Sequence, residues 1–281
     1  MKTRRTAIVV ACAVTAFVSI VLAGPLTPPG GAVSSTGRTL DEIYTKVTTP
    51  DDGRIRITAA TTISQPGSYL LTTDLTTNGS PIIIASDNVT IDLNGMTVRS
   101  TNTSAYAIGF TTAASNVVIR NGRIIGGGTC LGTSQAVNNV VFEDLTLVGG
   151  KLNGIALNSS NARSCTMRRC RVIDTGSTTT ATDVNLAITG ISVSSAATLI
   201  EDCFVSQIIY NGTGTPLLRG ISLNTATATG NIISRCTVTS ATNVTATGIF
   251  IAGLGFYRDN TVEAFSTSYN APGATNAGGN N

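Results

Sequence analysis

The sequence predicts an all-β protein in which short parallel strands wind into a solenoid, each turn stacking on the one before. Two observations predict this fold class. Cysteine returns at a fixed interval of 33 residues, at Cys170, Cys203 and Cys236, with apolar residues at constant distances on both sides. The composition has only 12% charged residues, 29 glycines and an abundance of Thr, Ser and Asn, which favours strands and tight turns over helices.

Each cysteine marks position zero of a repeat. An apolar residue lies three positions before it and another lies two positions after it, as in Met167 and Val172 around Cys170. The same pattern fits segments with Gly122, Leu145 or Asn260 at zero, so the zero positions run 122, 145, 170, 203, 236, 260. Their spacings are 23, 25, 33, 33 and 24 residues, so the bare turn takes 23 to 25 residues and the longer intervals carry loops. A unit this small buries its apolar face only by stacking on its neighbours.

A second element precedes the later zero positions. It reads glycine, apolar, any residue, apolar, as in "GIAL" at Gly154, "GISV" at Gly190, "GISL" at Gly220 and "GIFI" at Gly248. Each rung, meaning one turn of the solenoid, therefore holds two or three short strands.

The three cysteines are predicted to form one interior column, where a small apolar side chain fits. Stacked Cα atoms about 4.8 Å apart are within disulfide reach. We nevertheless expect free thiols, because three in a row cannot all pair. An odd number of cysteines follows Cys12, which also argues against a disulfide framework.

Charged residues just before position zero alternate in sign from rung to rung. One position before zero the series includes Asp144, Arg169, Asp202 and Arg235, and two positions before zero Glu143, Arg168 and Glu201 follow the same rule. On stacked parallel rungs these residues are expected to form outward ladders of opposite charges. We predict that the ladders fix the register of the rungs and have no catalytic role.

Other segments follow from composition. Residues 1–23, with a basic start and an apolar run, are predicted to be a signal peptide, with an uncleaved membrane anchor as the alternative. Residues 24–38 are predicted to be a linker and 39–265 the solenoid domain, which a short amphipathic helix at 39–47 would begin. Residues 266–281 are predicted to be a flexible tail. We expect a secreted or cell-surface protein with no membrane segment in the mature chain.

The segments "ISQPGSYLLTTDL" and "IIIASDNVTIDLNGMTV", with "SNVVIRNGRIIGG" after them, resemble the opening coils of bacterial secreted right-handed parallel β-helix repeat proteins of the pectin-lyase-like superfamily. The resemblance covers about residues 39–265 and implies a right-handed parallel β-helix with a helix capping its N-terminal end. It also implies that a polysaccharide substrate would lie on the outer face of one sheet. Lyases of the superfamily use Arg or Lys as a base with Ca²⁺ held by aspartates, and its hydrolases use clustered aspartates.

The strands with the pattern glycine, apolar, any residue, apolar should form that sheet, with Gly109, Ala156, Ser192, Ser222 and Phe250 facing outward. None of these side chains is a general acid or base, and the chain has no histidine. We therefore predict a non-catalytic glycan-associated or structural protein that needs no cofactor. The alternative is a polysaccharide lyase or hydrolase, with Ca²⁺ possible only for the lyase, whose site would be built from four loop charges: Lys151, Asp174, Asp183 and Arg219.

The expected partner is a polysaccharide or a cell-envelope glycan. The formal net charge is +3, and three of the basic residues are Lys2, Arg4 and Arg5 at the start of the chain. Because we find no basic stripe interleaved with aromatic residues, we expect no nucleic-acid partner.

Overall fold

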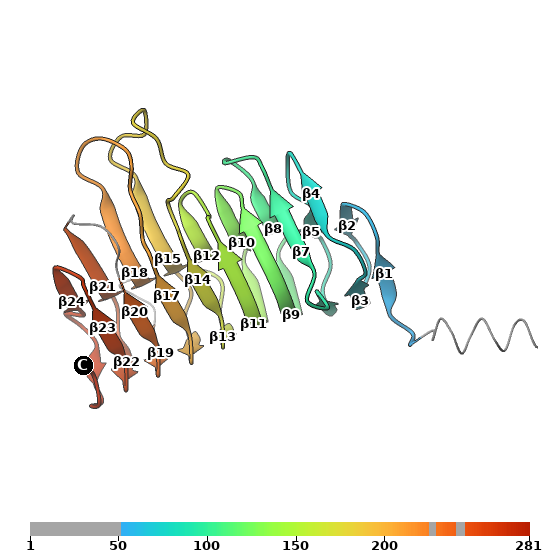
Figure 1. Cartoon of the computed structure of the whole chain (residues 1–281). Helices are drawn as coiled ribbons and strands as arrows, with labels where there is room; N and C mark the ends of the chain where they lie inside the picture. The colour runs from blue at the N-terminus through green and yellow to red at the C-terminus, as the bar shows by residue number, and fades with distance from the viewer. Residues whose placement is uncertain (1–51, 225–228, 240–244) are drawn as a thin grey trace, which may run out of the picture. The chain divides into compact units, whose positions relative to one another are not determined.

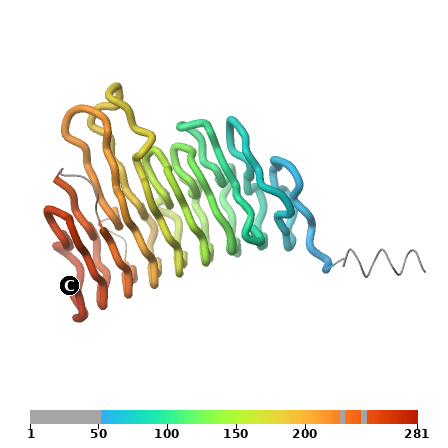
Figure 2. The backbone as a smooth tube through the Cα atoms, viewed as in Figure 1, coloured from blue at the N-terminus to red at the C-terminus, as the bar shows by residue number. Residues whose placement is uncertain are grey.

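A computed structural model of the chain describes residues 52–224, 229–239 and 245–281. Within these residues the chain forms 25 strands, all pairing in parallel, and no helix. They wind into a right-handed parallel β-helix (Figures 1 and 2), which confirms the predicted fold class. The predicted signal peptide, linker and capping helix lie outside the described residues. In the described residues no helix is long and apolar enough to cross a bilayer.

The β-helix has three walls, each a ladder of parallel strands. Wall 1 contains β1 (Ile55–Ile57), β3 (Gly67–Leu71), β6 (Val89–Asp92), the first half of β9 (Ala114–Gly126) and of β11 (Val137–Val148), β13 (Thr166–Arg168), β16 (Leu199–Glu201), β19 (Asn231–Ser234), β22 (Gly255–Arg258) and β25 (Thr275–Asn276). Wall 2 contains β4 (Leu75–Thr77), β7 (Thr97–Ser100), the second halves of β9 and β11, β14 (Arg171–Ile173), β17 (Phe204–Ser206), β20 (Thr237–Thr239) and β23 (Thr261–Glu263). Wall 3 is a separate sheet of β2 (Thr61–Ile63), β5 (Ile82–Ile84), β8 (Tyr106–Phe110), β10 (Thr129–Thr133), β12 (Asn153–Leu157), β15 (Ala187–Val193), β18 (Leu217–Leu223), β21 (Ala246–Ile251) and β24 (Thr267–Asn270).

The predicted cysteine column is confirmed. Met167 pairs with Ile200, and Val172 pairs with Val205, so Cys170 and Cys203 occupy the same position in adjacent rungs. The same register continues to Cys236. The three side chains are 1–2% exposed, and all five described cysteines are free thiols. The Sγ of Cys203 lies 3.6 Å from the carbonyl oxygen of Met167, which gives the buried thiol an acceptor in the rung below.

The repeated glycine of the wall 3 strands faces a valine of wall 2 across the core. A Cβ atom at Gly154 would lie 2.2 Å from Cγ1 of Val172, and one at Gly220 would lie 2.1 Å from Cγ1 of Val238. Real Cβ atoms do not approach other carbon atoms this closely, so only glycine fits without movement of the valine.

The corner between walls 1 and 2 is a residue in the left-handed conformation in the six rungs whose wall 1 strands run from β9 to β22. The position before zero has φ between 51° and 60° at Asn121, Asp144, Arg169, Asp202, Arg235 and Asp259. Asn and Asp tolerate this conformation better than other non-glycine residues do. The charged ladder therefore also forms the turn, a role that the sequence analysis did not assign to it.

Ion pairs join the corner ladder in the predicted order. Register places Arg168 between Glu143 and Glu201, and Arg169 makes two hydrogen bonds to Asp144, of 2.7 and 2.8 Å. Arg235 contacts Asp202 at 2.6 Å in the same way. Each of these arginines contacts an acidic side chain of the preceding rung, so each ion pair links two adjacent rungs.

The β-helix continues past Phe265, where the sequence analysis placed the start of a flexible tail. Strand β24 pairs with β21 in wall 3, and β25 pairs with β22 in wall 1. The Nδ2 of the buried Asn260 donates to Oδ1 of Asn280 at 3.0 Å. The polar, glycine-rich segment is thus ordered by backbone pairing with the last rung, which composition alone does not reveal.

Candidate functional site

The outer face of wall 3 carries two columns of side chains. One contains the five predicted residues Gly109, Ala156, Ser192, Ser222 and Phe250 in register, together with Gly132, which was not predicted. The other column lies three residues earlier in each strand. It consists of Tyr106, Thr129, Asn153, Thr189, Arg219 and Thr247. This second column is uncharged except for Arg219, and it is rich in hydroxyl and amide groups.

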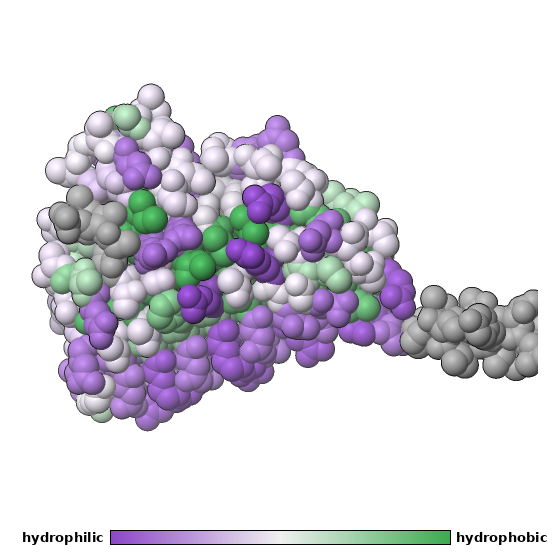
Figure 3. Space-filling model, viewed as in Figure 1, coloured by the Kyte–Doolittle hydropathy of each residue, from purple (hydrophilic) through white to green (hydrophobic). Residues whose placement is uncertain are grey.

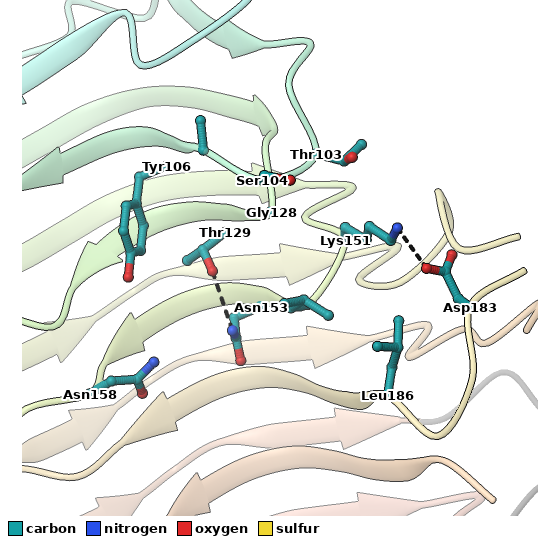
Figure 4. A pocket seen from close by; sticks show the side chains of 12 residues that line it. Thr103, Ser104, Tyr106, Gly128, Thr129, Lys151, Asn153, Asn158, Asp183 and Leu186 are labelled. Atoms are coloured by element: carbon teal, nitrogen blue, oxygen red, sulfur yellow. Dashed lines mark hydrogen bonds and ion pairs between the residues drawn. The ribbon is translucent and has the colours of Figure 1, made fainter. Parts of the chain in front are cut away.

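A groove with a volume of about 420 Å³ lies on this face over β8, β10 and β12 (Figure 4). Its floor contains Tyr106, Thr129 and Asn153, and Asn158 lies at one end. The Nδ2 of Asn153 donates to Oγ1 of Thr129 at 3.2 Å. A Cβ at Gly109 would lie 3.2 Å from the ring atom Cγ of Tyr106, so the absence of a side chain there leaves room for the tyrosine to lie over the sheet.

An ion pair closes the other end of the groove. Nζ of Lys151 lies 2.7 Å from Oδ1 of Asp183, and the two side chains are 22% and 14% exposed. The second carboxylate oxygen of Asp183 accepts from the backbone N–H of Thr180 at 2.8 Å. The hydroxyl of Tyr210 donates to the backbone carbonyl of Asp183 at 2.9 Å. These contacts fix the loop between β14 and β15 against the groove, and we call the pair of Lys151 and Asp183 the latch.

The latch stabilises the ionised form of Asp183. The hydrogen bond from Lys151, followed by the one from the Thr180 backbone, holds the pKa of the Asp183 carboxyl below its usual value of 3.8. At neutral pH the carboxylate is therefore ionised and paired. Such a group cannot donate a proton as a general acid.

Further along wall 3, a network of polar side chains surrounds Arg219. One guanidinium nitrogen of Arg219 donates to Oγ of Ser222 at 3.0 Å and to Oδ1 of Asn224 at 2.9 Å. The amide nitrogen of Asn224 donates to Oγ of Ser192 at 2.9 Å. The guanidinium also stacks on the ring of Phe250, with 3.4 Å between Cζ and the ring centroid.

Arg219 has an unusual environment for a charged side chain. Its Nε atom is buried and has no hydrogen-bond partner, and burial lowers the pKa of the guanidinium. The stacking on Phe250 partly compensates for this desolvation, since a cation is attracted to the face of an aromatic ring.

The structure brings together two of the four loop charges considered from sequence. Lys151 and Asp183 form the latch. Arg219 contacts Ser222, Asn224 and Phe250, and neither it nor Asp174 lines the groove formed by the described residues. Asp174 instead occupies a left-handed corner, with φ of 56°, at the start of the loop that carries Asp183. In the described part of the chain, no group of three or more Cys, Asp or Glu side chains is arranged to hold a metal ion.

Sequence reasoning missed the column of Tyr106, Thr129 and Asn153. The signal was present, because each of the later members immediately precedes the glycine of the wall 3 pattern, as Asn153 precedes Gly154. Strict alternation would turn that residue inward. Consecutive residues Gly154 and Ile155 are instead both buried, which returns Asn153 to the outer face.

No protein-family model matches the chain, and no curated protein matches it significantly. The chain is a right-handed parallel β-helix protein. Solved structures that resemble it include the Dettilon tailspike protein (gp208), with 13% identity, a TM-score of 0.48 and coverage of 91% of this chain and 65% of that one. This chain thus spans about two thirds of the tailspike chain. An alginate lyase from Paenibacillus sp. str. FPU-7 matches at 10% identity and a TM-score of 0.43, over 75% of this chain and 93% of that one. Pectate lyase Pel9A matches at 10% identity and a TM-score of 0.40, over 75% and 70%.

Proposed function

We propose that this protein is exported from the cell and binds a polysaccharide in the groove on wall 3 without cleaving it. The observation that carries the proposal is the lining of the groove. Thr129, Asn153 and Asn158 offer uncharged donors and acceptors on one face, and the ring of Tyr106 lies beside them. Hydroxyl and amide groups complement sugar hydroxyls, and an aromatic ring complements the apolar face of a sugar.

The two charges of the groove support binding over catalysis. Both carboxylate oxygens of Asp183 have protein partners, and Lys151 is held by the same carboxylate. A general acid or base needs a proton to give or a free lone pair near the substrate at neutral pH. The latch offers neither, because its charges neutralise each other.

One observation favours a second candidate function, a polysaccharide lyase. A lyase needs a base that removes a proton from a sugar carbon, and an arginine can serve only if its environment weakens its hold on its own proton. Burial lowers the pKa of Arg219, which is the required direction. Its hydrogen bonds to Ser222 and Asn224 fix the guanidinium on the outer face of wall 3.

A panel of neutral and acidic polysaccharides separates the two functions. Each polysaccharide is cast into a native gel to measure retardation of the protein, and is incubated with the protein to measure new reducing or unsaturated ends. We expect retardation by at least one polysaccharide and no new ends. New ends that disappear in Arg219→Gln would establish the lyase and contradict the non-catalytic account.

Two variants test whether the polysaccharide binds in the groove. Tyr106→Ala and Asn153→Ala should each weaken retardation by roughly 3- to 10-fold, the loss expected for one hydrogen bond or one ring contact. The matched control is Thr146→Ala, a change to a half-buried side chain on wall 2. Equal effects of all three variants would show that the polysaccharide does not bind in the groove.

A further inference from the structure

Wall 2 carries arginines that differ from those of the corner. At the corner, Arg168, Arg169 and Arg235 all form ion pairs with Asp or Glu. On wall 2, Arg99 of β7 and Arg123 of β9 have no ion pair or side-chain hydrogen bond with any of the residues described here. The protein therefore pairs its cations at one corner and leaves two of them available on a neighbouring wall.

Register places the two unpaired arginines next to each other. Thr97 pairs with Arg123 and Arg99 pairs with Ile125, while the residues between them, Val98 and Ile124, are buried in the core. Arg99 and Arg123 therefore both face outward, on adjacent rungs and two residues apart along the strand. Two rungs beyond Arg123, Arg171 faces outward in the same column and lies over the ring of Phe204, 4.6 Å from its centroid.

The acids nearest to this face in register are engaged or lie at its edge. The carboxylate of Asp74 accepts the backbone N–H of Thr97 at 2.7 Å. Asp174 lies at the corner that leaves wall 2, and Glu263 lies on the last strand of the wall. In Figure 3 the visible face carries a band of apolar side chains with strongly hydrophilic ones beside it. Register assigns half-buried Ile125, Val148 and Ile173 to the outer face of this wall.

A hollow of about 330 Å³ lies beside Arg99. Its lining consists of Arg99, Ile125, three glycines and five hydroxyl-bearing residues: Ser100, Thr101, Thr103, Ser177 and Thr178. Two of its glycines, Gly126 and Gly149, occupy the left-handed corner position that Asp174 holds in the next rung, with φ of 74° and 70°. A Cβ atom at Gly149 would lie 3.7 Å from Oγ of Ser177, so the missing side chain at this corner leaves space between Arg99 and the loop at Ser177.

We propose that this hollow and the two unpaired arginines form a second binding site, which takes an oxyanion group carried by a polymer, such as the sulfate or carboxylate of an acidic polysaccharide. Guanidinium groups bind such oxyanions with charge-assisted hydrogen bonds, and the surrounding hydroxyls can complete the contacts. The partly apolar floor accommodates the carbon skeleton of the bound unit. Thr103 lines both this hollow and the groove on wall 3, but Arg99 and Arg123 do not line the groove and Tyr106 does not line the hollow, so variants of these residues test the two sites independently.

The test uses the full chain and a matched pair of probes, dextran sulfate and neutral dextran. We expect the protein to bind dextran sulfate and not dextran through this site, with inorganic sulfate competing. The double variant Arg99→Gln/Arg123→Gln should weaken dextran sulfate binding at least about tenfold, since each lost contact is a charge-assisted hydrogen bond. The control Arg163→Gln/Arg258→Gln removes the same net charge elsewhere, from two exposed arginines. It should weaken binding about twofold at most.

A third variant tests the hollow without changing charge. Thr178 is exposed in the loop that borders the hollow, so Thr178→Trp should fill part of the space and weaken dextran sulfate binding while the fold is kept. Equal losses in the two double variants, or full binding by Thr178→Trp together with no competition by inorganic sulfate, would overturn the proposal. Tyr106→Ala should leave dextran sulfate binding unchanged, which distinguishes failure of this site from failure of the groove on wall 3.

Discussion

Gly190 of wall 3 faces Val205 of wall 2 across the interior of the β-helix, and a Cβ atom at Gly190 would lie 2.3 Å from Cγ1 of Val205. The same relation joins Gly248 to Val262 at 2.1 Å. The two repeated motifs of the sequence are therefore two sides of one packing contact. Each wall 3 strand that contains this glycine is followed by a valine two residues after the next position zero.

Gly190→Ala is expected to destabilise the protein by about 1–3 kcal/mol, the usual cost of overpacking a filled core. Chemical denaturation measures the effect. Gly79→Ala is the control, because nothing lies within 4 Å of a Cβ at that position, and it should change the free energy of unfolding by less than about 0.5 kcal/mol. The double variant Gly190→Ala/Val205→Ala should recover part of the loss. Additive losses in the double variant would show that the contact is not the cause.

The corner pair of Asp144 and Arg169 should make stability depend on pH. The hydrogen bonds from Arg169 hold the pKa of Asp144 below its usual value of 3.8. A carboxyl whose pKa is lower in the folded state stabilises the protein above its unfolded pKa, and the stabilisation is lost as the pH falls through the folded pKa.

Asp144→Asn should accordingly cost about 0.2–1 kcal/mol at neutral pH and nothing once the pH is well below 3.8, since about half of each side chain is exposed to solvent. Asn tolerates the left-handed corner as Asp does. The matched change Asp259→Asn, at a corner whose nearest cation is 4.0 Å away, should cost less. A difference between Asp144→Asn and the wild type that is independent of pH would contradict the assignment.

The five described cysteines should resist thiol reagents in the folded protein. All five are buried, which keeps reagents away from the sulfur atoms. Burial also raises the pKa of Cys130 to about 12 and that of Cys165 to about 11, so the reactive thiolate of these two residues is scarce. In the variant Cys12→Ser, mass spectrometry after alkylation should detect no label on the folded chain and five labels after unfolding without reductant. Fewer than five labels on the unfolded chain would reveal a disulfide.

Opening the latch should release the loop between β14 and β15. Asp183→Asn removes the charge that holds Lys151, and limited proteolysis should then cut residues 174–186 faster than in the wild type. Because the pKa of Asp183 is lowered by Lys151, the wild-type loop should stay protected until the pH falls below the usual value of 3.8. Asp259→Asn again serves as the control. Equal cleavage rates in all three proteins would show that the latch does not restrain the loop.

The periodic part of the fold could be predicted from the sequence because stacking repeats the same physical constraint in every rung. Cys170, Cys203 and Cys236 each fill the same small interior space, so one pattern repeats at each zero position. Only one of the two properties of the corner residues was predicted. The alternating charges of Asp144, Arg169 and Asp202 were predicted to pair. The left-handed backbone conformation that these residues share was not predicted, because the pattern of charges does not indicate it.

The candidate site was harder to predict because it depends on single side chains in loops of unequal length. Lys151 and Asp183 meet because one loop is long enough to fold back over wall 3, a path that no spacing in the sequence specifies. Arg219 lies within a strand, yet its neighbours Ser222 and Asn224 were uninformative polar residues until the register was known. The tail after Phe265 was misjudged for the opposite reason, since backbone pairing orders it despite its composition.

The proposed function requires that a polysaccharide occupies the outer face of wall 3. Amide hydrogen exchange, followed by mass spectrometry, tests it most directly when the protein is compared with and without the polysaccharide that retards it in gels. We expect slower exchange in peptides of β8, β10, β12 and the loop at Asp183, with wall 1 unchanged. Protection confined to walls 1 and 2, with none on wall 3, would contradict it.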